Sequence, residues 1–527
     1  MSTPTLFGLV SRGYFPKELP PAFNTRSFAK IARNPAALPG EFTNPHKPTK
    51  NVNHSYLARA NSRRRLGIVN PIDYVALSII IINNWKQLRT IHNKTRVSLT
   101  SPVYHGPPKR AFGYKYTYDK MDDLKAKVRS RSRYLLRADI SQYYHSIYTH
   151  SIAWVIHGKK TAKLRQKDYT LLGNILDRSI RHSQDNQTVG IPIGPDVSFI
   201  VAETILSICD EQLHKMGIKN YTRFIDDYEF GCESLQTAEH YRGKLQEILS
   251  EFELVLNPDK TKIIELPITL ANPCISYIRT YELREKEAKS QRYALISIFD
   301  NVFQNLGEDP DVSLVRYLLG KIKNTTIIEK ENWTLYENLL LQCIMSDPST
   351  ISYVLDELLY YQNQNYPLNI SHIKHVMSIL IETHAPVNHG SEVAWALSTH
   401  IALGITISMD AAKAASKMND SVVAILLLDA ISKNLIKSSI DLTNYISLMT
   451  TGELYGDNWL LSYEANVKNW LSSYKVADHV KADKCFNCLK TASVEFYDDK
   501  WLNKNKPFRP PTPWPYWPGG GGDGGGY

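Results

Sequence analysis

The stretch YTRFIDDYEF, residues 221–230, places two adjacent aspartates, Asp226 and Asp227, between two short apolar runs. The runs RFI and YEF carry β-branched and aromatic residues, which indicates two short strands. The acidic pair then lies at the tip of a tight hairpin, because aspartate tolerates turn geometry. Such a pair is either a solvated turn or a pair of carboxylates directed at a hard cation. The second interpretation requires a third carboxylate and a phosphate-bearing substrate that shares the metal.

The third carboxylate lies upstream, in RYLLRADISQYYHSIYTH, residues 133–150. The run YLLRADI predicts a strand that carries Asp139 at its C-terminal end. The chain between Asp139 and Asp226 is long enough for a helical crossover that returns to the same sheet. If this strand pairs with the hairpin, the three carboxylates converge at one edge of the sheet.

A cluster of three carboxylates cannot stay fully ionised without a counter-charge. Mg²⁺ or Mn²⁺ relieves the repulsion, and Mg²⁺ prefers one or two carboxylates completed by the phosphates of a substrate. Two such ions can activate an attacking hydroxyl and stabilise a leaving pyrophosphate. The sequence therefore predicts a phosphoryl-transfer metal site formed by Asp139, Asp226 and Asp227.

Length and charge are compatible with a multidomain protein that binds nucleic acid. The chain has 527 residues, which favours two or three domains, and a formal net charge of +10. Basic residues gather before residue 140, in SRRRLG (62–67), PPKRAFGYKYTYDK (107–120) and KAKVRSRSRYLLR (125–137), with tyrosines among them. This arrangement suits phosphate contacts and base stacking, and it is also typical of a solvated basic face.

Cysteine usage and hydropathy favour a cytoplasmic protein with no membrane association. The first residues lack the pattern of a secretory signal, and no apolar run approaches the roughly 18 to 20 residues that span a bilayer. Six cysteines in so long a chain do not indicate a disulfide framework. Cys485 and Cys488 form one CxxC with His479 nearby, which is half of a zinc site, so the sequence leaves metal binding there open.

The chain changes character along its length. Residues 1–60 are rich in proline, asparagine and basic residues, and we expect an extended arm. Residues 71–93 predict a strong helix that begins at a proline. From about residue 285 to 475, apolar residues recur at helical spacing and predict an all-helical region. Two of the predicted buried faces are Ile351, Val354, Leu355, Leu358 and Leu359, and Ile373, Val376, Met377, Leu380 and Ile381.

Four motifs in order resemble those of reverse transcriptases. They are Asp139 with an aromatic residue five positions on, GIPIGP (190–195), FIDD (224–227) and LNPDKTKI (256–263). The resemblance covers about residues 60–265. It implies an α+β right-hand polymerase with fingers and palm at residues 61–270. An all-helical, thumb-like accessory domain would follow at residues 285–475, and a C-terminal segment with a Pro/Trp/Gly-rich tail at residues 476–527.

The resemblance also assigns roles to single residues. Asp139 and Asp226 match metal ligands, Asp227 matches their acidic neighbour, and Lys260 matches the lysine near the departing pyrophosphate. Tyr144 matches the aromatic steric gate that packs against the sugar and disfavours ribonucleotides. Residues implied to contact the nucleotide or template are Gly190, Pro192, Gly194 and Phe224, and our candidates for gripping the triphosphate are Lys109 and Arg110, with Arg96 behind them.

At two positions the sequence differs from the usual reverse transcriptase pattern, and these differences indicate a particular group within the family. Phe224 stands where the family usually has tyrosine, and Ile193 stands where it usually has glutamine. These features are similar to the bacterial abortive-infection and "unknown group" reverse transcriptases of antiphage defence, including systems that encode two such polymerases. That group implies Mg²⁺ or Mn²⁺ as cofactor, dNTPs, a noncoding RNA, a DNA product and an oligomer, homomeric or with a partner reverse transcriptase. The alternatives are a template-independent nucleotidyltransferase and an RNA-binding scaffold without chemistry.

The C-terminal run PFRPPTPWPYWPGGGGDGGGY ends at Tyr527 on a glycine-rich stretch. Its low-complexity composition cannot build a core, which favours a tail with no catalytic part. The other interpretation is that the tail carries the Tyr527 hydroxyl into an active site as a primer, because side-chain hydroxyls can serve as nucleophiles.

Overall fold

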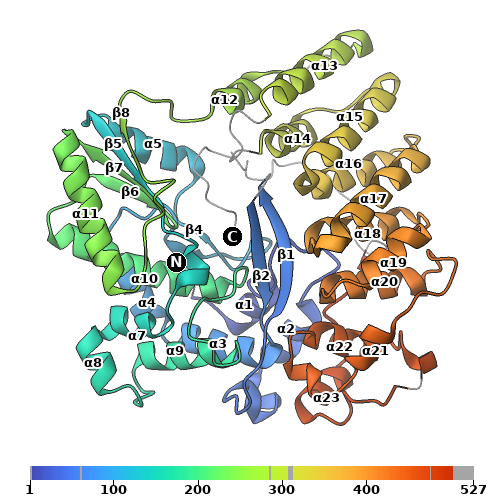
Figure 1. Cartoon of the computed structure of the whole chain (residues 1–527), viewed down its shortest axis with the longest axis horizontal. Coiled ribbons are helices and arrows are strands. Elements are labelled where there is room, and N and C mark those ends of the chain that lie inside the picture. Colours follow the sequence, from blue (N-terminus) through green and yellow to red (C-terminus); the bar gives the residue numbers. More distant parts are fainter. Residues whose placement is uncertain (1–2, 60–61, 284–286, 307–312, 475, 502–527) are drawn as a thin grey trace.

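The computed structural model describes residues 3–59, 62–283, 287–306, 313–474 and 476–501. The Pro/Trp/Gly-rich tail with Tyr527 lies outside the described residues. Figure 1 shows a mixed α/β part, a part built of helices, and the hairpin of β1 and β2 between the two. In the described part of the chain, no helix is long and apolar enough to cross a membrane.

A four-stranded antiparallel sheet carries the acidic motifs. Its strands lie in the order β6 (Tyr221–Phe224), β7 (Asp227–Cys232), β5 (Tyr134–Ala138) and β8 (Lys262–Glu265). Phe224 pairs with Asp227 across a two-residue turn, so the predicted hairpin is confirmed. Ala138 pairs with Tyr228, so the predicted strand before Asp139 lies beside that hairpin.

Helices cover this sheet and connect its strands. Helix α11 (Leu235–Glu251) packs on β5 and β7, and α5 (Tyr118–Arg129) packs on β6 and β7. Helix α10 (Asp196–Lys215) packs against α11 and is buried along most of its length. Between α4 and β6, the further elements of this part are β3 (Pro102–Tyr104), β4 (Phe112–Tyr114), α6 (Tyr143–Ser146), α7 (His150–His157), α8 (Lys159–Leu164) and α9 (Leu172–His182).

The helix expected at residues 71–93 is two helices. Helix α3 (Pro71–Asn83) is followed by the capping residue Asn84, and α4 (Trp85–His92) begins directly after it. The Asn84 side chain donates a hydrogen bond to the Ile80 carbonyl at 2.9 Å. Asparagine side chains compete with helical hydrogen bonds in this way, which accounts for the break.

The N-terminal segment is not the extended arm that we expected. Residues 6–12 form α1 (Leu6–Arg12), residues 26–32 form α2 (Arg26–Ala32), and both helices contribute buried residues to the core. Tyr14 stacks on Tyr74 of α3, with the ring centroids 3.9 Å apart. Burial of large aromatic side chains outweighs the weak local helical signal, so this segment belongs to the core of the α/β part.

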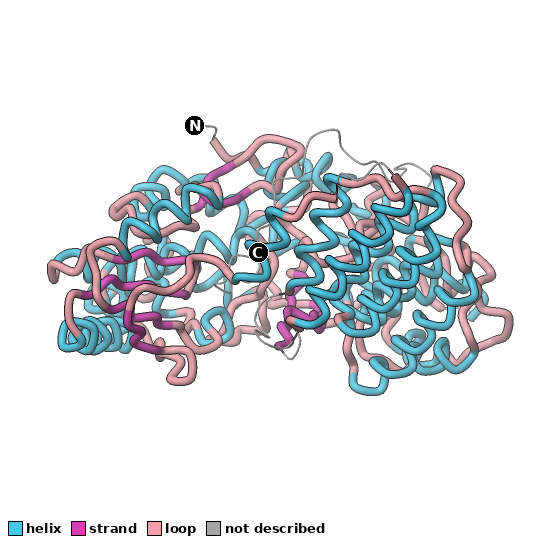
Figure 2. The backbone as a smooth tube through the Cα atoms, turned by 90° about the horizontal axis from the view of Figure 1, so that it is seen from above, coloured by secondary structure: helices cyan, strands magenta, loops and turns pink. Residues whose placement is uncertain are grey.

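From Pro273 to Thr491 every described element is a helix. Figure 2 shows these helices stacked side by side. The two predicted apolar faces on α16 and α17 are buried, which confirms them. The α-helices are α12 (Pro273–Thr280), α13 (Ala288–Gln304), α14 (Leu314–Thr325), α15 (Trp333–Ser346), α16 (Ile351–Asn363), α17 (Ile370–His384), α18 (Gly390–Leu403), α19 (Met409–Ser416), α20 (Ser421–Ser432), α21 (Thr443–Ser447), α22 (Trp459–Val467) and α23 (Lys484–Thr491).

The hairpin of β1 (Val52–Arg59) and β2 (Ser62–Ile68) joins the two parts of the molecule. On the helical side, β1 packs on α18 and α20, and buried His54 lies 2.8 Å from Asp420. On the other side, the Gly67 amide donates to the Ile193 carbonyl at 2.9 Å. The same strand pair therefore contacts both the helical region and the GIPIGP segment.

Candidate active site

Three carboxylates and one ammonium group come together at the edge of the sheet. Asp139 follows the last residue of β5, Asp226 lies in the β6–β7 turn, and Asp227 begins β7. Asp139 lies close enough that its charge acts on both Asp226 and Asp227. Lys260 Nζ lies 3.6 Å from Asp139 Oδ1. The structure thus brings together four residues that the sequence placed in one site.

The carboxylates of the acidic cluster repel one another. Burial and the charge of Asp139 raise the pKa of Asp226 to about 6. Burial and the charges of Asp226 and Asp139 raise the pKa of Asp227 well above its ordinary value. Lys260 opposes both shifts and does not cancel them. Carboxylates that repel one another in this way have the donor set that Mg²⁺ or Mn²⁺ requires, so these residues fit a hard divalent cation.

The turn that carries Asp226 is strained. Ile225 has φ of 54°, a left-handed conformation that β-branched residues rarely adopt. Its backbone is held on both sides, because the Ile225 amide donates to Thr100 Oγ1 at 3.1 Å and its carbonyl accepts from Arg223 at 2.7 Å. Strain of this kind persists only where the surrounding structure enforces it.

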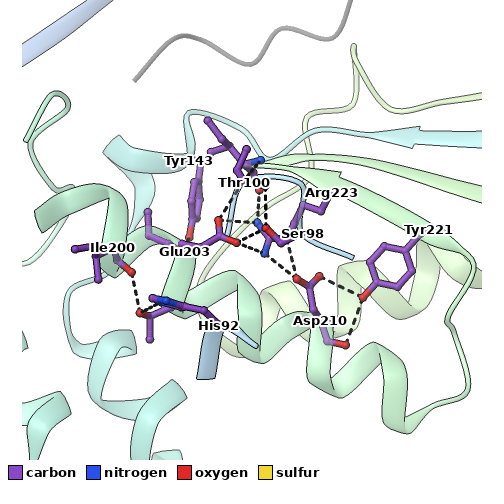
Figure 3. Close-up of polar contacts among 12 residues, drawn as sticks. His92, Ser98, Thr100, Tyr143, Ile200, Glu203, Asp210, Tyr221 and Arg223 are labelled. Carbon is purple, nitrogen blue, oxygen red and sulfur yellow. Dashed lines mark hydrogen bonds and ion pairs between the residues drawn. The ribbon is translucent and has the colours of Figure 1, made fainter. Parts of the chain in front are cut away.

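A buried network of charged residues holds the backbone of Ile225 in this conformation (Figure 3). The guanidinium of Arg223 is fully buried and donates to Glu203 at 2.8 Å and to Asp210 at 2.8 Å, both on α10. Burial alone would lower the pKa of Arg223, but the charges of Asp210 and Glu203 outweigh it and raise the pKa well above its ordinary value. Glu203 also accepts from Thr100 at 3.4 Å, so both residues that hold Ile225 are bonded to the same carboxylate.

The GIPIGP segment leads directly into α10. Gly190 and Gly194 have φ of 85° and 122°, which only glycine adopts readily. A Cβ on Gly194 would lie 2.5 Å from Pro16 Cγ, so that position also lacks space for a side chain. Pro192 lies against Gly67 of β2, where an added Cβ would approach the proline Cβ to 2.6 Å. Because α10 begins at Asp196, one rigid helix links the glycine turn to the acidic hairpin.

Arg110, one of the candidates for the triphosphate, is hydrogen-bonded to other parts of the protein. Its guanidinium donates to Asp196 Oδ1 at 2.5 Å and to the Phe15 and Gly194 carbonyls. Asp196 is buried at the start of α10 and needs a counter-charge, which Arg110 supplies. Lys109 and Arg96 are exposed, and no described hydrogen bond or ion pair connects either side chain to the acidic cluster.

Tyr144 and Phe224 lie on elements next to the cluster. Tyr144 is in α6, a few residues after Asp139, and its side chain is buried. Its carbonyl accepts from the Ile191 amide at 2.8 Å, which joins α6 to the glycine turn. Phe224 ends β6 and packs edge to face on Tyr114, with the centroids 5.6 Å apart.

Sequence reasoning missed several residues that shape the site. The charge of Arg64 in β2 opposes the rise in the pKa of Asp226, and burial together with the charges of Arg65 and Arg64 lowers the pKa of His145. The basic run at residues 62–67 is visible in the sequence and includes Arg64. The local sequence does not indicate that this run lies near the acidic cluster. Nothing in the motif pattern indicated that Arg223 would be buried with Glu203.

The CxxC does not form a metal cluster in the described residues. Cys485 and Cys488 lie on α23, and burial raises the pKa of the Cys485 thiol to about 12. His479 Nε2 lies 2.9 Å from Ser462 Oγ, so that ring nitrogen is already engaged.

Comparison with known families gives one match. The family model for reverse transcriptase (RNA-dependent DNA polymerase) matches residues 58–293. These residues include the sheet, the acidic cluster, the glycine turn and Lys260. A search of curated proteins finds no match to the chain.

We predict that Thr100→Val impairs nucleotide incorporation without unfolding the protein. Valine keeps the shape of threonine but removes the acceptor for the Ile225 amide. An unpaired buried amide costs about 1–3 kcal/mol, which the turn can relieve by moving Asp226. We expect kcat to fall about tenfold and the Mg²⁺ concentration for half-maximal rate to rise, both measured by incorporation of labelled dNTP.

The matched control is Thr204→Val, which removes a different buried hydroxyl, on α10. Thr204 Oγ1 contacts His92 and the Ile200 carbonyl, not the turn. We expect this variant to lose stability but to keep the Mg²⁺ requirement of the wild type. Equal Mg²⁺ requirements in the wild type and both variants would show that Thr100 does not position the acidic turn.

Proposed function

We propose, from the reverse transcriptase domain that the chain carries over residues 58–293, that the protein makes DNA from deoxynucleoside triphosphates at Asp139, Asp226 and Asp227. The protein is an enzyme, an RNA-directed DNA polymerase and thus a nucleotidyltransferase. One observation supports the location of the site most directly. Three carboxylates from the end of β5, the β6–β7 turn and the start of β7 meet beside Lys260, and burial together with repulsion raises the pKa values of Asp226 and Asp227.

Asp139 and Asp226 would hold Mg²⁺ or Mn²⁺, with Asp227 as their acidic neighbour. The chemistry that a bound cation supplies is activation of the primer hydroxyl and neutralisation of the leaving pyrophosphate. The residues around the cluster supply the remaining charge and shape. Lys260 places an ammonium group 3.6 Å from Asp139, where it can also neutralise phosphate oxygens.

Other residues of the chain bind and orient the nucleotide. Arg64 on β2 is the candidate for the triphosphate, because its charge reaches Asp226 and it lies on the hairpin that contacts the glycine turn. Gly190 and Gly194 allow the backbone to approach the nucleotide closely. Tyr144 is the proposed steric gate against a 2′-hydroxyl, and Phe224 lies where the primer end would be.

We infer a right-hand arrangement for the whole chain. Residues 61–270 would supply fingers and palm, with the four-stranded sheet as the palm. The helices of residues 285–475 would act as a thumb-like accessory domain, followed by the C-terminal segment 476–527. The contacts of β1 with α18 and α20 support this arrangement, because they attach the helical region to a hairpin beside the active site.

The biological setting is also a proposal. The departures at Ile193 and Phe224 favour a bacterial, cytoplasmic antiphage system in which the polymerase works with a noncoding RNA. It would act as an oligomer, with itself or with a partner reverse transcriptase. Protein priming by Tyr527 belongs to the same proposal, and Tyr527 lies outside the described residues.

The carboxylates of Asp139 and Asp226 can be tested by neutral substitutions of the same shape. Asp226→Asn or Asp139→Asn should abolish incorporation, with a loss of about 10³-fold or more, because several kcal/mol of charge stabilisation disappear. The variants should stay folded in the presence of a chelator, since they lose a repulsive charge. Incorporation of labelled dNTP and thermal unfolding measure the two effects.

Asp259→Asn is the matched control for these variants. Asp259 is exposed, neighbours Lys260 and carries the same charge, but it lies outside the cluster. We expect near wild-type activity from it. Near wild-type activity in a folded Asp226→Asn protein would contradict the assignment of the active site.

A separate prediction concerns the choice of sugar. Tyr144→Ala should admit ribonucleotides, because it removes the bulk that excludes a 2′-hydroxyl. The measurement is the ratio of kcat/KM for dNTP to that for rNTP, which we expect to fall at least about tenfold, with Tyr148→Ala as the control on a nearby tyrosine. An unchanged ratio in Tyr144→Ala would make Tyr144 a residue of the core only.

A further inference from the structure

Three potential metal ligands converge in the helical region, away from the acidic cluster. His384 ends α17, His389 directly precedes α18, and Glu392 lies in the first turn of α18. The Nδ1 atoms of the two histidines lie 3.0 Å apart. Glu392 Oε1 lies 3.7 Å from each of them.

Hydrogen bonding accounts for only part of this geometry. One histidine can donate to the other at 3.0 Å, but 3.7 Å is too long for a hydrogen bond from either ring to Glu392. Glu392 is already satisfied by Arg63, at 2.6 Å and 2.8 Å, and by Ser391 at 2.7 Å. The carboxylate therefore gives no reason for both rings to face it at equal distance.

A shared cation accounts for all three separations. In a triangle with sides of 3.0, 3.7 and 3.7 Å, the point equidistant from the corners lies about 2.0 Å from each. Typical zinc distances are about 2.0–2.1 Å to imidazole nitrogen and about 2.0–2.2 Å to carboxylate oxygen. The existing positions of the three atoms therefore match a common ligand sphere without rearrangement.

We propose that His384, His389 and Glu392 form a binding site for a divalent transition-metal ion, of which Zn²⁺ fits best. Two imidazoles and one carboxylate favour Zn²⁺ over Mg²⁺, which prefers oxygen ligands. The histidine side chains are 20% and 29% exposed and that of Glu392 is 1% exposed, so an ion can enter from solvent and keep a water as fourth ligand.

Arg63 lies next to the proposed ligand Glu392 and orients its carboxylate. Arg63 opposes a cation electrostatically, but its two hydrogen bonds fix the orientation of the Glu392 carboxylate. Groups that fix a ligand in this way are common around metal sites.

A metal at this position would connect three elements. It would join the end of α17 to the start of α18, and through Glu392 and Arg63 it would fasten both helices to β2. Because β2 also carries Arg64, the site would strengthen the attachment of the helical region to the hairpin beside the acidic cluster. The proposed role is structural and does not depend on the chemistry of that cluster.

The test is Co²⁺ binding to the full chain, stripped of metal and held in excess Mg²⁺ to occupy the acidic cluster. Co²⁺ in a tetrahedral site with imidazole ligands absorbs visible light, and Zn²⁺ should displace it. We expect one equivalent in the wild type, and an affinity at least about 100-fold lower in His384→Ala and His389→Ala. The exposed His375 on the same helix provides the matched control, His375→Ala, which should bind as the wild type does.

Two further variants distinguish this site from two other places where Co²⁺ could bind, the acidic cluster and the CxxC. Asp226→Asn should keep the bound Co²⁺, and so should Cys485→Ser. The proposal is overturned if the wild type binds no more Co²⁺ than His389→Ala does. It is also overturned if Asp226→Asn or Cys485→Ser loses the bound equivalent of Co²⁺ while His389→Ala keeps it.

Discussion

The buried ion pairs of Arg223 with Glu203 and Asp210 are the constraint on which the site depends. A guanidinium removed from water is stable only when it is paired, and breaking such a pair costs about 3–5 kcal/mol. Arg223 lies on β6 and both partners lie on α10, so the acidic hairpin and this helix cannot move independently. The same guanidinium holds the carbonyl of Ile225, and in this way a charge pair in the core fixes the strained turn that presents Asp226.

Helix α10 carries this constraint to the rest of the site. Its first residue, Asp196, is paired with Arg110, whose guanidinium also binds the carbonyl of Gly194. The glycine turn in turn contacts β2 through the Gly67 amide and the Ile193 carbonyl. A continuous set of hydrogen bonds therefore runs from the acidic turn, through α10 and the glycine turn, to the hairpin that holds the helical region.

Local patterns predicted the elements that carry the motifs. Alternating apolar residues around Asp226 and before Asp139 determine strand pairing, because each strand has one buried face. Helical spacing likewise identified the buried faces of α16 and α17. Contacts between distant segments were not predictable in this way. The pairing of Arg110 with Asp196, the burial of Arg223 and the proximity of Arg64 to Asp226 arise only when separate elements pack, and one sequence carries no signal of which charges meet.

In the proposed function, Asp139 and Asp226 would hold divalent cations that receive a deoxynucleoside triphosphate. The most direct measurement is a crystal structure of the full chain with Mn²⁺ and a non-hydrolysable dNTP, with manganese located by its anomalous signal. We expect manganese at Asp139 and Asp226, and a triphosphate that extends toward Lys260 and Arg64. A nucleotide bound elsewhere, with no manganese at these carboxylates, would contradict the proposed function.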